Sequence, residues 1–295
     1  MQSDEIQITT GENTFQTASF EPNDKTVDYV TSKNLSYTDI ISILYGLNAV
    51  SEFYDVMSAV TTTPLGVFAV ALGKTIEEAI ISAMDSNPID FISSTVVLSN
   101  EVNSDAAKLL KDVKIVVAPK FTKNAEEYLE MHDVCYVTIK TPIKDYKKYL
   151  SNKVLTTPLG TLIQSPNVSE LDKDSFKTLT KTKPTVEQIE DAVFAWKVAK
   201  HIKSRAIVIA KNLKTGAIAQ GLQSALTEYA LDYSCEGSKD AILACDMPIT
   251  AHDVNVAAQG RIALLILPSA QKDIITLADK YGMIVITTGF SNVLC

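Results

Sequence analysis

The amino-acid sequence predicts an α/β protein, in which strands and helices alternate along the chain. The first observation behind this prediction is a set of short apolar runs that are rich in β-branched residues. Near-continuous apolarity over about five residues is typical of strands that helices cover on both faces. The predicted strands lie at residues 94–98, 114–118, 134–139, 206–210, 262–267 and 283–287.

The second observation is the helical pattern between these runs, where two helix starts carry a capping signal. Thr75 precedes Glu78, and Thr185 precedes Gln188, at the spacing of a capping box. The second signal opens the clearest helix, whose apolar residues recur at intervals of three and four and form one stripe. The stripe comprises Ile189, Ala192, Val193, Trp196 and Ala199. We expect Trp196 to lie in the core rather than in a ligand site.

The third observation is a stretch from about residue 145 to residue 183 that has few periodic patterns. It is rich in lysine, threonine and serine, and it contains Pro158 and Pro166. Such composition is typical of a connection between folded units. The sequence therefore predicts a first lobe at residues 1–145, a connecting segment at 146–185 and a second lobe at 186–295.

Composition limits the classes of function. The chain has 295 residues, of which 46% are hydrophobic, enough for one large core or two ordinary ones. Its formal net charge of −8 argues against a nucleic-acid-binding surface. The densest basic group, Lys144, Lys147 and Lys148, lies beside Asp145 and is interpreted as a solvated helix face. A polar, acidic start and short apolar runs predict a cytoplasmic protein without membrane contact.

The cysteines and histidines form no recognisable metal or disulfide pattern. The four cysteines are scattered without pairing intervals, so we expect free thiols in a reducing compartment. The three histidines, His132, His201 and His252, form no helical pair, and no Cys-x-x-Cys motif occurs. We therefore expect no metal site.

A series of motifs occurs in a fixed order along the chain. Residues 35–40 read LSYTDI, 118–121 APKF, 181–185 KTKPT, 194–204 FAWKVAKHIKS and 206–211 AIVIAK. They resemble LSYNNI, APxF, TKRxPT, FAWKVxKHxKSN and AIVLAKD of one enzyme family. That family is the AICAR formyltransferase/IMP cyclohydrolase family, where AICAR is aminoimidazole carboxamide ribonucleotide, and the resemblance is to its transformylase portion.

This resemblance covers residues 11–295, with gaps, and includes no counterpart of the family's cyclohydrolase domain. It implies two cytidine-deaminase-like α/β/α lobes with mixed sheets. It also implies a homodimer with active sites at the subunit interface. For a chain that has lost catalysis, the alternative is a heterodimer with a catalytic relative.

The family's reaction moves a formyl group from 10-formyltetrahydrofolate to the exocyclic amine of AICAR. It requires a base, cations that stabilise negative charge, and a phosphate clamp. In the family, the Lys-His pair of KHxNPCG supplies the base and a cation. The matching residues 60–66 read VTTTPLG, so Thr61 replaces the family base. A threonine hydroxyl is no general base at neutral pH, and losing such a base typically costs about 10²–10⁴ in rate.

Other positions that the resemblance assigns to the family's site are also replaced. The Arg-Tyr and Pro-His of RYGENPHQ become Thr9-Thr10 and Thr14-Phe15. The arginine of GIGAGQxSR becomes Ala225, SAFGG becomes residues 90–94, and the terminal Arg and His become Ser291 and Asn292.

Four residues remain as candidates for ligand binding: Arg205, Asp246, Asn13 and Lys211. Asp246 is the one clear match to a site residue, and Arg205 replaces the asparagine of KSN. If both lie in the former cleft, they should form a charge-assisted pair that fills the space of the imidazole ring. The alternative is that Arg205 points to solvent near a helix C-terminus, where positive charge is favoured.

Three hypotheses of function stay open. The first is a formyltransferase-like protein of purine biosynthesis that is catalytically degenerate and acts as a structural or regulatory subunit. The second is an active AICAR formyltransferase that uses 10-formyltetrahydrofolate, with His201 or His252 as a relocated base. The third is a binding module for a small, nucleotide-like ligand. No cofactor is expected, apart from 10-formyltetrahydrofolate in the second case.

Overall fold

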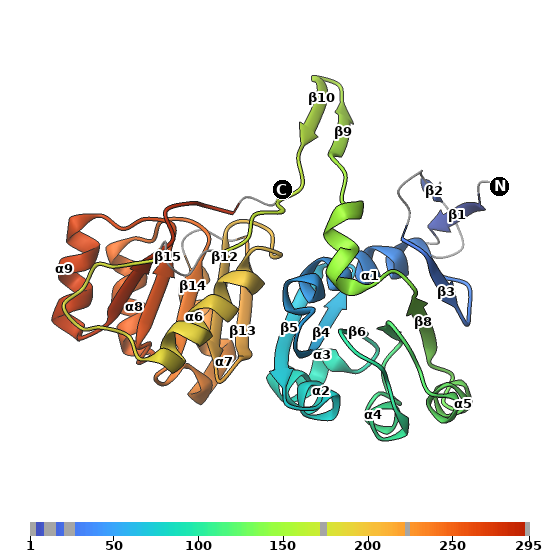
Figure 1. Cartoon of the computed structure of the whole chain (residues 1–295). Coiled ribbons are helices and arrows are strands. Elements are labelled where there is room, and N and C mark those ends of the chain that lie inside the picture. Colours follow the sequence, from blue (N-terminus) through green and yellow to red (C-terminus); the bar gives the residue numbers. More distant parts are fainter. Residues whose placement is uncertain (1–3, 9–15, 21–26, 172–175, 222–224, 293–295) are drawn as a thin grey trace.

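A computed structural model describes residues 4–8, 16–20, 27–171, 176–221 and 225–292 of the chain. Figure 1 shows two halves side by side, with a narrow hairpin that projects away from both. The α-helices are α1 (Tyr37–Val50), α2 (Ile76–Ser86), α3 (Pro88–Phe91), α4 (Ser104–Leu109), α5 (Lys123–Met131), α6 (Val186–Ala199), α7 (Leu226–Ser234), α8 (Ala251–Gln259) and α9 (Lys272–Tyr281). Short 3-10 helices are η1 (Ser51–Phe53), η2 (Ile143–Tyr149) and η4 (Cys235–Ser238).

The strands confirm the six predicted runs to within one or two residues. They are β1 (Asp4–Ile8), β2 (Gln16–Phe20), β3 (Tyr29–Thr31), β4 (Met57–Thr63), β5 (Gly66–Gly73), β6 (Thr95–Leu98), β7 (Ile115–Ala118), β8 (Cys135–Ile139), β9 (Lys153–Thr157), β10 (Gly160–Gln164), β11 (Lys177–Thr178), β12 (Ala206–Lys211), β13 (Lys214–Gln220), β14 (Ile242–Cys245), β15 (Leu264–Leu267) and β16 (Ile284–Thr287).

Within the described residues, one mixed sheet of 12 strands runs through both halves, in the order β11-β16-β15-β14-β12-β13-β5-β4-β6-β7-β8-β3. Each half repeats one plan. A helix leads into an antiparallel hairpin, a third strand pairs antiparallel with the first, and two further strands follow in parallel. The α/β class with mixed sheets is thus confirmed, and the two expected sheets are joined into one.

The join between the two half-sheets is short. Strands β5 and β13 pair antiparallel at Ala71 and Lys214. The Leu72 amide donates to the carbonyl of Leu213 at 2.9 Å. The side chain of Thr215 crosses the same seam, and its hydroxyl accepts from the Val70 amide at 3.0 Å. Because the pairing is antiparallel, the turn between β4 and β5 lies beside the end of β13. In the same way, the turn between β12 and β13 lies beside the end of β5.

Helices cover both faces of the sheet, so side chains that alternate between the two faces of a strand are all buried. In β7, Ile115 and Val117 join a core with α1 and α6, whereas Val116 and Ala118 join a core with α2, α4 and α5. A third core lies between the second half-sheet and α7, α8 and α9. The α1 and α6 core extends across both halves, which makes these two helices a shared layer.

The predicted helix starts are present. Thr185 and Gln188 form a complete capping box at the start of α6. Thr75 accepts from the Glu78 amide at the start of α2, but Glu78 Oε2 accepts from the Lys74 amide, one residue earlier than a capping box requires. Trp196 is buried in the α1 and α6 core, as expected.

The predicted connecting segment, residues 146–185, contains secondary structure of its own. Strands β9 and β10 form a separate two-stranded sheet, which is the projecting hairpin of Figure 1. Strand β11 then pairs with β16 at the edge of the second half-sheet. The residue boundaries of the two lobes stay a prediction. Across the described residues, every helix is too short or too polar to cross a bilayer.

Candidate functional site

The carboxyl ends of β14, β15 and β16 meet at one edge of the second half-sheet, where polar residues gather. Open α/β sheets commonly bind ligands outside the carboxyl ends of their strands. Strand β12 runs antiparallel to β14, so its first residues reach the same edge. We call residues 204–206, 246, 250–253 and 287–292 the strand-end edge.

Asp246 lies at this edge, fully buried, and both of its carboxylate oxygens are occupied. Oδ1 accepts from the Ala206 amide at 2.9 Å, and Oδ2 accepts from the Ser204 hydroxyl at 2.5 Å. Burial raises the pKa of Asp246 above its ordinary value, and these two hydrogen bonds offset only part of the effect.

The first half of the chain repeats one of these contacts with a different residue. Ser99 Oγ accepts from the Ser58 amide at 2.9 Å. In both halves the next residue pair is in register, Ile207 with Cys245 and Ala59 with Leu98. Asp246 and Ser99 therefore occupy equivalent positions of the repeated fold. One oxygen of Asp246 thus serves an architectural contact that a neutral serine makes in the other half.

Arg205 forms its ion pair with Asp253, so it follows neither alternative that the sequence left open, a pair with Asp246 or a guanidinium that points to solvent. The guanidinium Nη2 lies 2.9 Å from Asp253 Oδ2, and both side chains are buried. Asp253 is placed there by the first turn of α8, because it is the third helical residue after the N-cap Thr250. The sequence held a signal for this placement, since Thr250 and Asp253 have capping-box spacing.

Asp253 is also satisfied by its neighbours. It accepts from the Thr227 hydroxyl at 2.7 Å and from the Thr250 amide at 2.8 Å. Burial alone would raise the pKa of Asp253, but these donors and Arg205 outweigh it and lower the pKa. The charged side chains of Arg205, Asp246 and Asp253 are therefore engaged within the protein.

Thr61, at the predicted position of the lost base, lies inside strand β4 and is 0% exposed. Its hydroxyl donates to the carbonyl of Ala69 in the neighbouring strand at 3.1 Å. A side chain with no accessible surface cannot contact a substrate. Thr61 is a structural residue of the first half-sheet.

The turn that follows Thr61 does approach the strand-end edge. Gln220, the last residue of β13, donates from Nε2 to the Leu65 carbonyl at 3.3 Å, and its Oε1 accepts from the Lys203 amide at 3.3 Å. The two regions that the motif comparison assigns to one site are therefore neighbours. Gln220 bridges them; it lies in residues 217–225, the stretch that matches GIGAGQxSR, although it was not among the candidate site residues.

The other two candidate residues do not join this edge. Lys211 lies at the opposite end of β12, about 17 Å from Ala206 at the usual rise per residue. Its ammonium donates to the Lys239 carbonyl at 2.8 Å. Asn13 lies outside the described residues.

The three histidines have different surroundings. His132 stacks on Tyr128 at the end of α5. His252, on the first turn of α8, is largely exposed and contacts Glu228 Oε1 at 2.5 Å. His201 follows the end of α6 and is mostly buried, with 14% of its side chain exposed. Burial lowers its pKa below the ordinary value, and contact with Glu52 offsets only part of this shift. Of the two bases considered from sequence, only His252 adjoins the strand-end edge.

His201 belongs to a charge cluster between the halves that sequence patterns did not reveal, in which Glu52 and Lys200 are buried and the other cations are partly exposed. Its centre is Glu52, in η1, and its cations come from η2 and α6. Glu52 Oε1 accepts from Lys200 at 2.8 Å, and Oε2 accepts from Lys147 at 3.0 Å. Lys197 donates to the Glu52 carbonyl at 2.9 Å. We call Glu52, Lys147, Lys197, Lys200 and His201 the Glu52 cluster.

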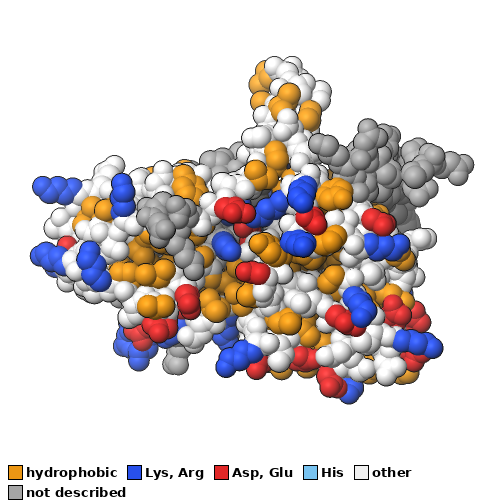
Figure 2. All heavy atoms as spheres, viewed as in Figure 1, with side chains coloured by type: hydrophobic (Ala, Val, Ile, Leu, Met, Phe, Trp, Pro, Cys, Tyr) orange, Lys and Arg blue, Asp and Glu red, His pale blue; other side chains and the backbone are white. Residues whose placement is uncertain are grey.

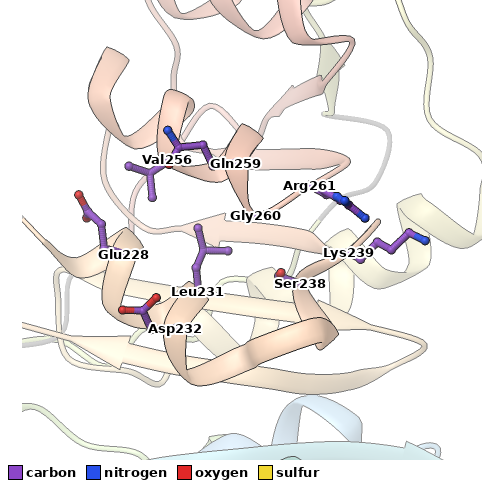
Figure 3. A pocket seen from close by; sticks show the side chains of 9 residues that line it. All are labelled: Glu228, Leu231, Asp232, Ser238, Lys239, Val256, Gln259, Gly260 and Arg261. Atoms are coloured by element: carbon purple, nitrogen blue, oxygen red, sulfur yellow. The ribbon is translucent and has the colours of Figure 1, made fainter.

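A hollow of about 680 Å³ opens between α7 and α8, and its lining residue Glu228 contacts His252 of the strand-end edge. Figure 3 shows Glu228 and Asp232 on one side and Lys239 and Arg261 on the other. Gly260, the C-cap of α8, lines the hollow, whereas Thr250 and Asp253 lie at the opposite end of that helix. Neither Arg205 nor Asp246 lines it. Over the described residues, no group of three His, Cys, Asp or Glu side chains is placed to hold a metal ion.

Known proteins resemble this chain over most of its length. The sequence model of the AICARFT/IMPCHase bienzyme family matches residues 2–231. The bifunctional purine biosynthesis protein PurH of Anoxybacillus flavithermus is 30% identical over 295 residues, which cover 95% of this chain and 57% of that protein. The PurH of Fusobacterium nucleatum is 32% identical over 289 residues, or 92% and 55%. The chain thus spans a little over half the length of these relatives. On the family match, which extends over more than three-quarters of its residues, the chain belongs to the AICARFT/IMPCHase bienzyme family.

Proposed function

We propose that this chain is a catalytically degenerate AICAR transformylase that serves purine biosynthesis as a structural or regulatory subunit. The observation that carries the proposal is the burial and hydrogen bonding of Thr61. It stands at the position of the family base, is fully buried, and donates its hydroxyl to the Ala69 carbonyl. Formyl transfer to a weakly nucleophilic amine needs an accessible base at that place.

The strand-end edge supports the same proposal. An anionic substrate needs a cation that can turn towards it, and Arg205 is held by Asp253 in a buried pair. Breaking a buried pair costs several kcal/mol because it leaves an uncompensated charge. Substrate binding through Arg205 would have to supply that energy. A cytoplasmic location is part of the proposal, since Cys135 and Cys245 are free thiols and the relatives are named for purine biosynthesis.

A formyl-transfer assay with AICAR and 10-formyltetrahydrofolate tests the proposal directly. We expect no turnover by the purified chain. Turnover within about a hundredfold of an ordinary enzyme's roughly 10 s⁻¹ would overturn the proposal. A thermal-shift screen with AICAR, folates and purine nucleotides accompanies the assay, and a shift without turnover would favour a small-ligand-binding module.

A second candidate function is an active transformylase with a relocated base. His252 favours it, because it is exposed, adjoins the strand-end edge and contacts the carboxylate of Glu228. A histidine with a carboxylate partner can act as a general base. Under this candidate, His252→Ala removes turnover and His132→Ala, a matched surface histidine, leaves it unchanged.

A further inference from the structure

The hollow between α7 and α8 lies at a place that the first half of the chain fills with an aromatic side chain. Directly before β14, the Ala241 amide donates to the Ser238 carbonyl at 3.0 Å. Directly before β6, the equivalent strand of the first half, the Ser94 amide donates to the Phe91 carbonyl at 3.2 Å. Ser238 and Phe91 therefore occupy equivalent positions of the repeated fold. Phe91 is buried in the core that contains α2 and α4, whereas Ser238 lines the hollow.

The end of the neighbouring helix differs in the same direction. The C-cap residue of α4 is Leu110, which is 0% exposed, and the C-cap residue of α8 is Gly260. Leu231 of α7 occupies part of the space beside this glycine, because a Cβ atom on Gly260 would lie 2.4 Å from Leu231 Cδ2. Leu231 and Val256 form the apolar lining of the hollow. The volume that remains lies within the range of about 300–1,000 Å³ that is typical of small-molecule sites.

Charged side chains of opposite sign lie at the two ends of the hollow. Figure 3 shows Glu228 and Asp232 at one end and Lys239 and Arg261 at the other, with Leu231 between them. Over most of the face seen in Figure 2, by contrast, basic and acidic side chains are interspersed. The helix dipoles favour Glu228 in the first turn of α7 and Arg261 just after α8 in any case. The open space between the two signs is therefore what distinguishes this place.

The basic end carries an excess of positive charge. Lys211 adds to Lys239 and Arg261, since its ammonium donates to the Lys239 carbonyl at 2.8 Å. Asp240 Oδ2 lies 3.9 Å from the same ammonium and offsets one of these charges. Arg261 has a φ angle of 57°, in the left-handed region where glycine is easier to accommodate. An anion at this end would meet a net positive charge.

The acidic end offers a carboxylate oxygen that lacks a donor. Glu228 Oε1 contacts His252 at 2.5 Å, whereas Oε2 is buried and has no hydrogen-bond partner among the described residues. A buried acceptor is costly to leave unpaired, and more so when it is charged. The terminal torsion of a glutamate side chain is soft, so a small rotation can turn Oε2 to the hollow. A protonated amine bound there would supply the missing donor.

We propose that the hollow between α7 and α8 binds a small zwitterion, whose anionic group contacts Lys239 and Arg261 and whose protonated amine contacts Glu228. The geometry of α8 gives the length of this ligand. Val256 and Gly260 lie one turn apart, about 6 Å along the helix, and the charged side chains lie beyond them at either end in Figure 3. The two charged groups of the ligand are therefore on the order of 10 Å apart.

Trialanine is the probe, because its amine and its carboxylate are about 10 Å apart when the peptide is extended. Titration calorimetry with the wild-type protein should give a Kd of about 1 mM or lower, an ordinary affinity for a ligand of this size. N-acetyl-trialanine lacks the cation and trialanine amide lacks the anion, and each should bind at least about tenfold more weakly. The amino acid ω-aminooctanoate separates its charges by the same number of chain atoms, so its affinity relative to trialanine distinguishes an amino acid from a peptide as the ligand.

Three variants test the contacts. Ser238→Phe introduces the residue of the first half and should abolish binding, because its ring fills the hollow. Glu228→Gln removes the negative charge and Arg261→Gly removes a cation, and each should weaken trialanine binding at least about tenfold. Glycine suits the φ angle of residue 261, so Arg261→Gly should fold as the wild type does. Glu190→Gln, an exposed carboxylate on α6, is the matched control.

Nuclear magnetic resonance locates the bound probe. The ring signals of His252, which contacts Glu228, should move when trialanine is added, and those of His132 should stay in place. No trialanine binding at about 10 mM, equal binding of the blocked peptides, unchanged His252 signals, or wild-type affinity of Ser238→Phe or Arg261→Gly would each overturn the site. Circular dichroism of every variant separates lost binding from lost folding, and none of these outcomes depends on formyl-transfer activity.

Discussion

Asp246 is the residue where function and architecture are hardest to separate. It matches a family site residue, yet Ser99 makes the equivalent backbone contact in the other half of the fold. The hydrogen bond from the Ala206 amide to Asp246 therefore has a structural role that does not depend on a ligand. What distinguishes Asp246 is its second oxygen, which accepts from the Ser204 hydroxyl.

Substitution of Asp246 and Ser99 should reveal this shared contact. Asp246→Ala leaves the buried Ala206 amide without an acceptor. We expect a loss of about 1–3 kcal/mol in the free energy of unfolding for each buried donor that is left unpaired. Ser99→Ala should cost a similar amount through the Ser58 amide. Asp246→Asn keeps one acceptor oxygen and should cost less than Asp246→Ala. Urea denaturation measures all three, and an unchanged Asp246→Ala protein would contradict the architectural role.

Thr61 gives a second prediction at this scale, because restoring the family's residues should not restore a site. Val60 and Thr61 are both 0% exposed within β4. Replacing them with Lys and His, as in the family motif, buries two polar side chains without partners, and we expect destabilisation of more than about 3 kcal/mol. Thermal denaturation and the formyl-transfer assay check this. A stable, active double variant would show that the strand can turn its side chains outward.

Among the elements, α1 depends on a close contact with the sheet. A Cβ atom placed on Gly46 would lie 2.2 Å from Val97 Cγ2 and 2.9 Å from Val97 Cβ. Helix α1 thus crosses strand β6 at a distance that only glycine permits, and this crossing fixes α1 in the layer shared with α6.

Gly46→Ala should therefore destabilise the protein although alanine favours helices. Overpacking of this kind typically costs about 1–3 kcal/mol, more than the roughly 1 kcal/mol gained in helix propensity. The second change Val97→Ala should recover part of the loss, because it removes the clashing methyl groups. Denaturation of both single variants and the double variant gives the coupling energy. Gly237→Ala, where nothing lies within 4 Å, is the control.

At the scale of the whole molecule, the Glu52 cluster links η1, η2 and α6. Burial alone would raise the pKa of Glu52, but His201 and Lys200 outweigh it and hold the pKa well below its usual range. Glu52→Gln should cost about 3–5 kcal/mol at neutral pH, the usual cost of removing one partner from a buried pair. Denaturation of Glu52→Gln beside the exposed control Glu101→Gln measures it.

The cluster also predicts how stability changes with pH. The folded-state pKa of Glu52 lies below its unfolded value of 4.5, so its stabilisation is complete above that pH and is lost as the pH falls. His201 has a folded-state pKa below 6.5, so the unfolded chain takes up this proton first on acidification. Stability should decline below about pH 6.5 and more steeply below about pH 4.5. The raised pKa of Asp246 acts in the opposite direction. Glu52→Gln should flatten the lower part of the profile.

The seam between the half-sheets offers a test of cooperativity. Thr215 Oγ1 accepts from the Val70 amide at 3.0 Å and lies 3.2 Å from the Val70 carbonyl. Thr215→Val keeps the shape but leaves that buried amide unpaired, and we expect a loss of about 1–3 kcal/mol. Hydrogen exchange should show reduced protection of Val70 first. Thr276→Val, at an exposed helical position, is the control, and equal effects of the two changes would show that the seam does not depend on Thr215.

The sequence alone determined the alternation of elements, because local patterns decide it. The continuous apolar runs predicted β6, β7, β8, β12, β15 and β16, and the Thr185 and Gln188 spacing predicted the start of α6. It also determined the family, whose motifs survive in the helices and strands that build the core. It gave no indication that the two sheets join, since the seam pairs β5 with β13, two strands that lie far apart in the chain.

Tertiary structure alone decided the partners of the charged residues. Arg205 could have met Asp246 or solvent, and it meets Asp253 because the first turn of α8 carries that carboxylate over the start of β12. Glu52 and Lys200 are 148 residues apart in the chain and lie 2.8 Å from one another only because α1 and α6 share one layer. Local propensity acts over a few residues, so the helices and strands could be predicted from the sequence. An ion pair depends on how distant elements pack, so these pairs could be found only from the fold.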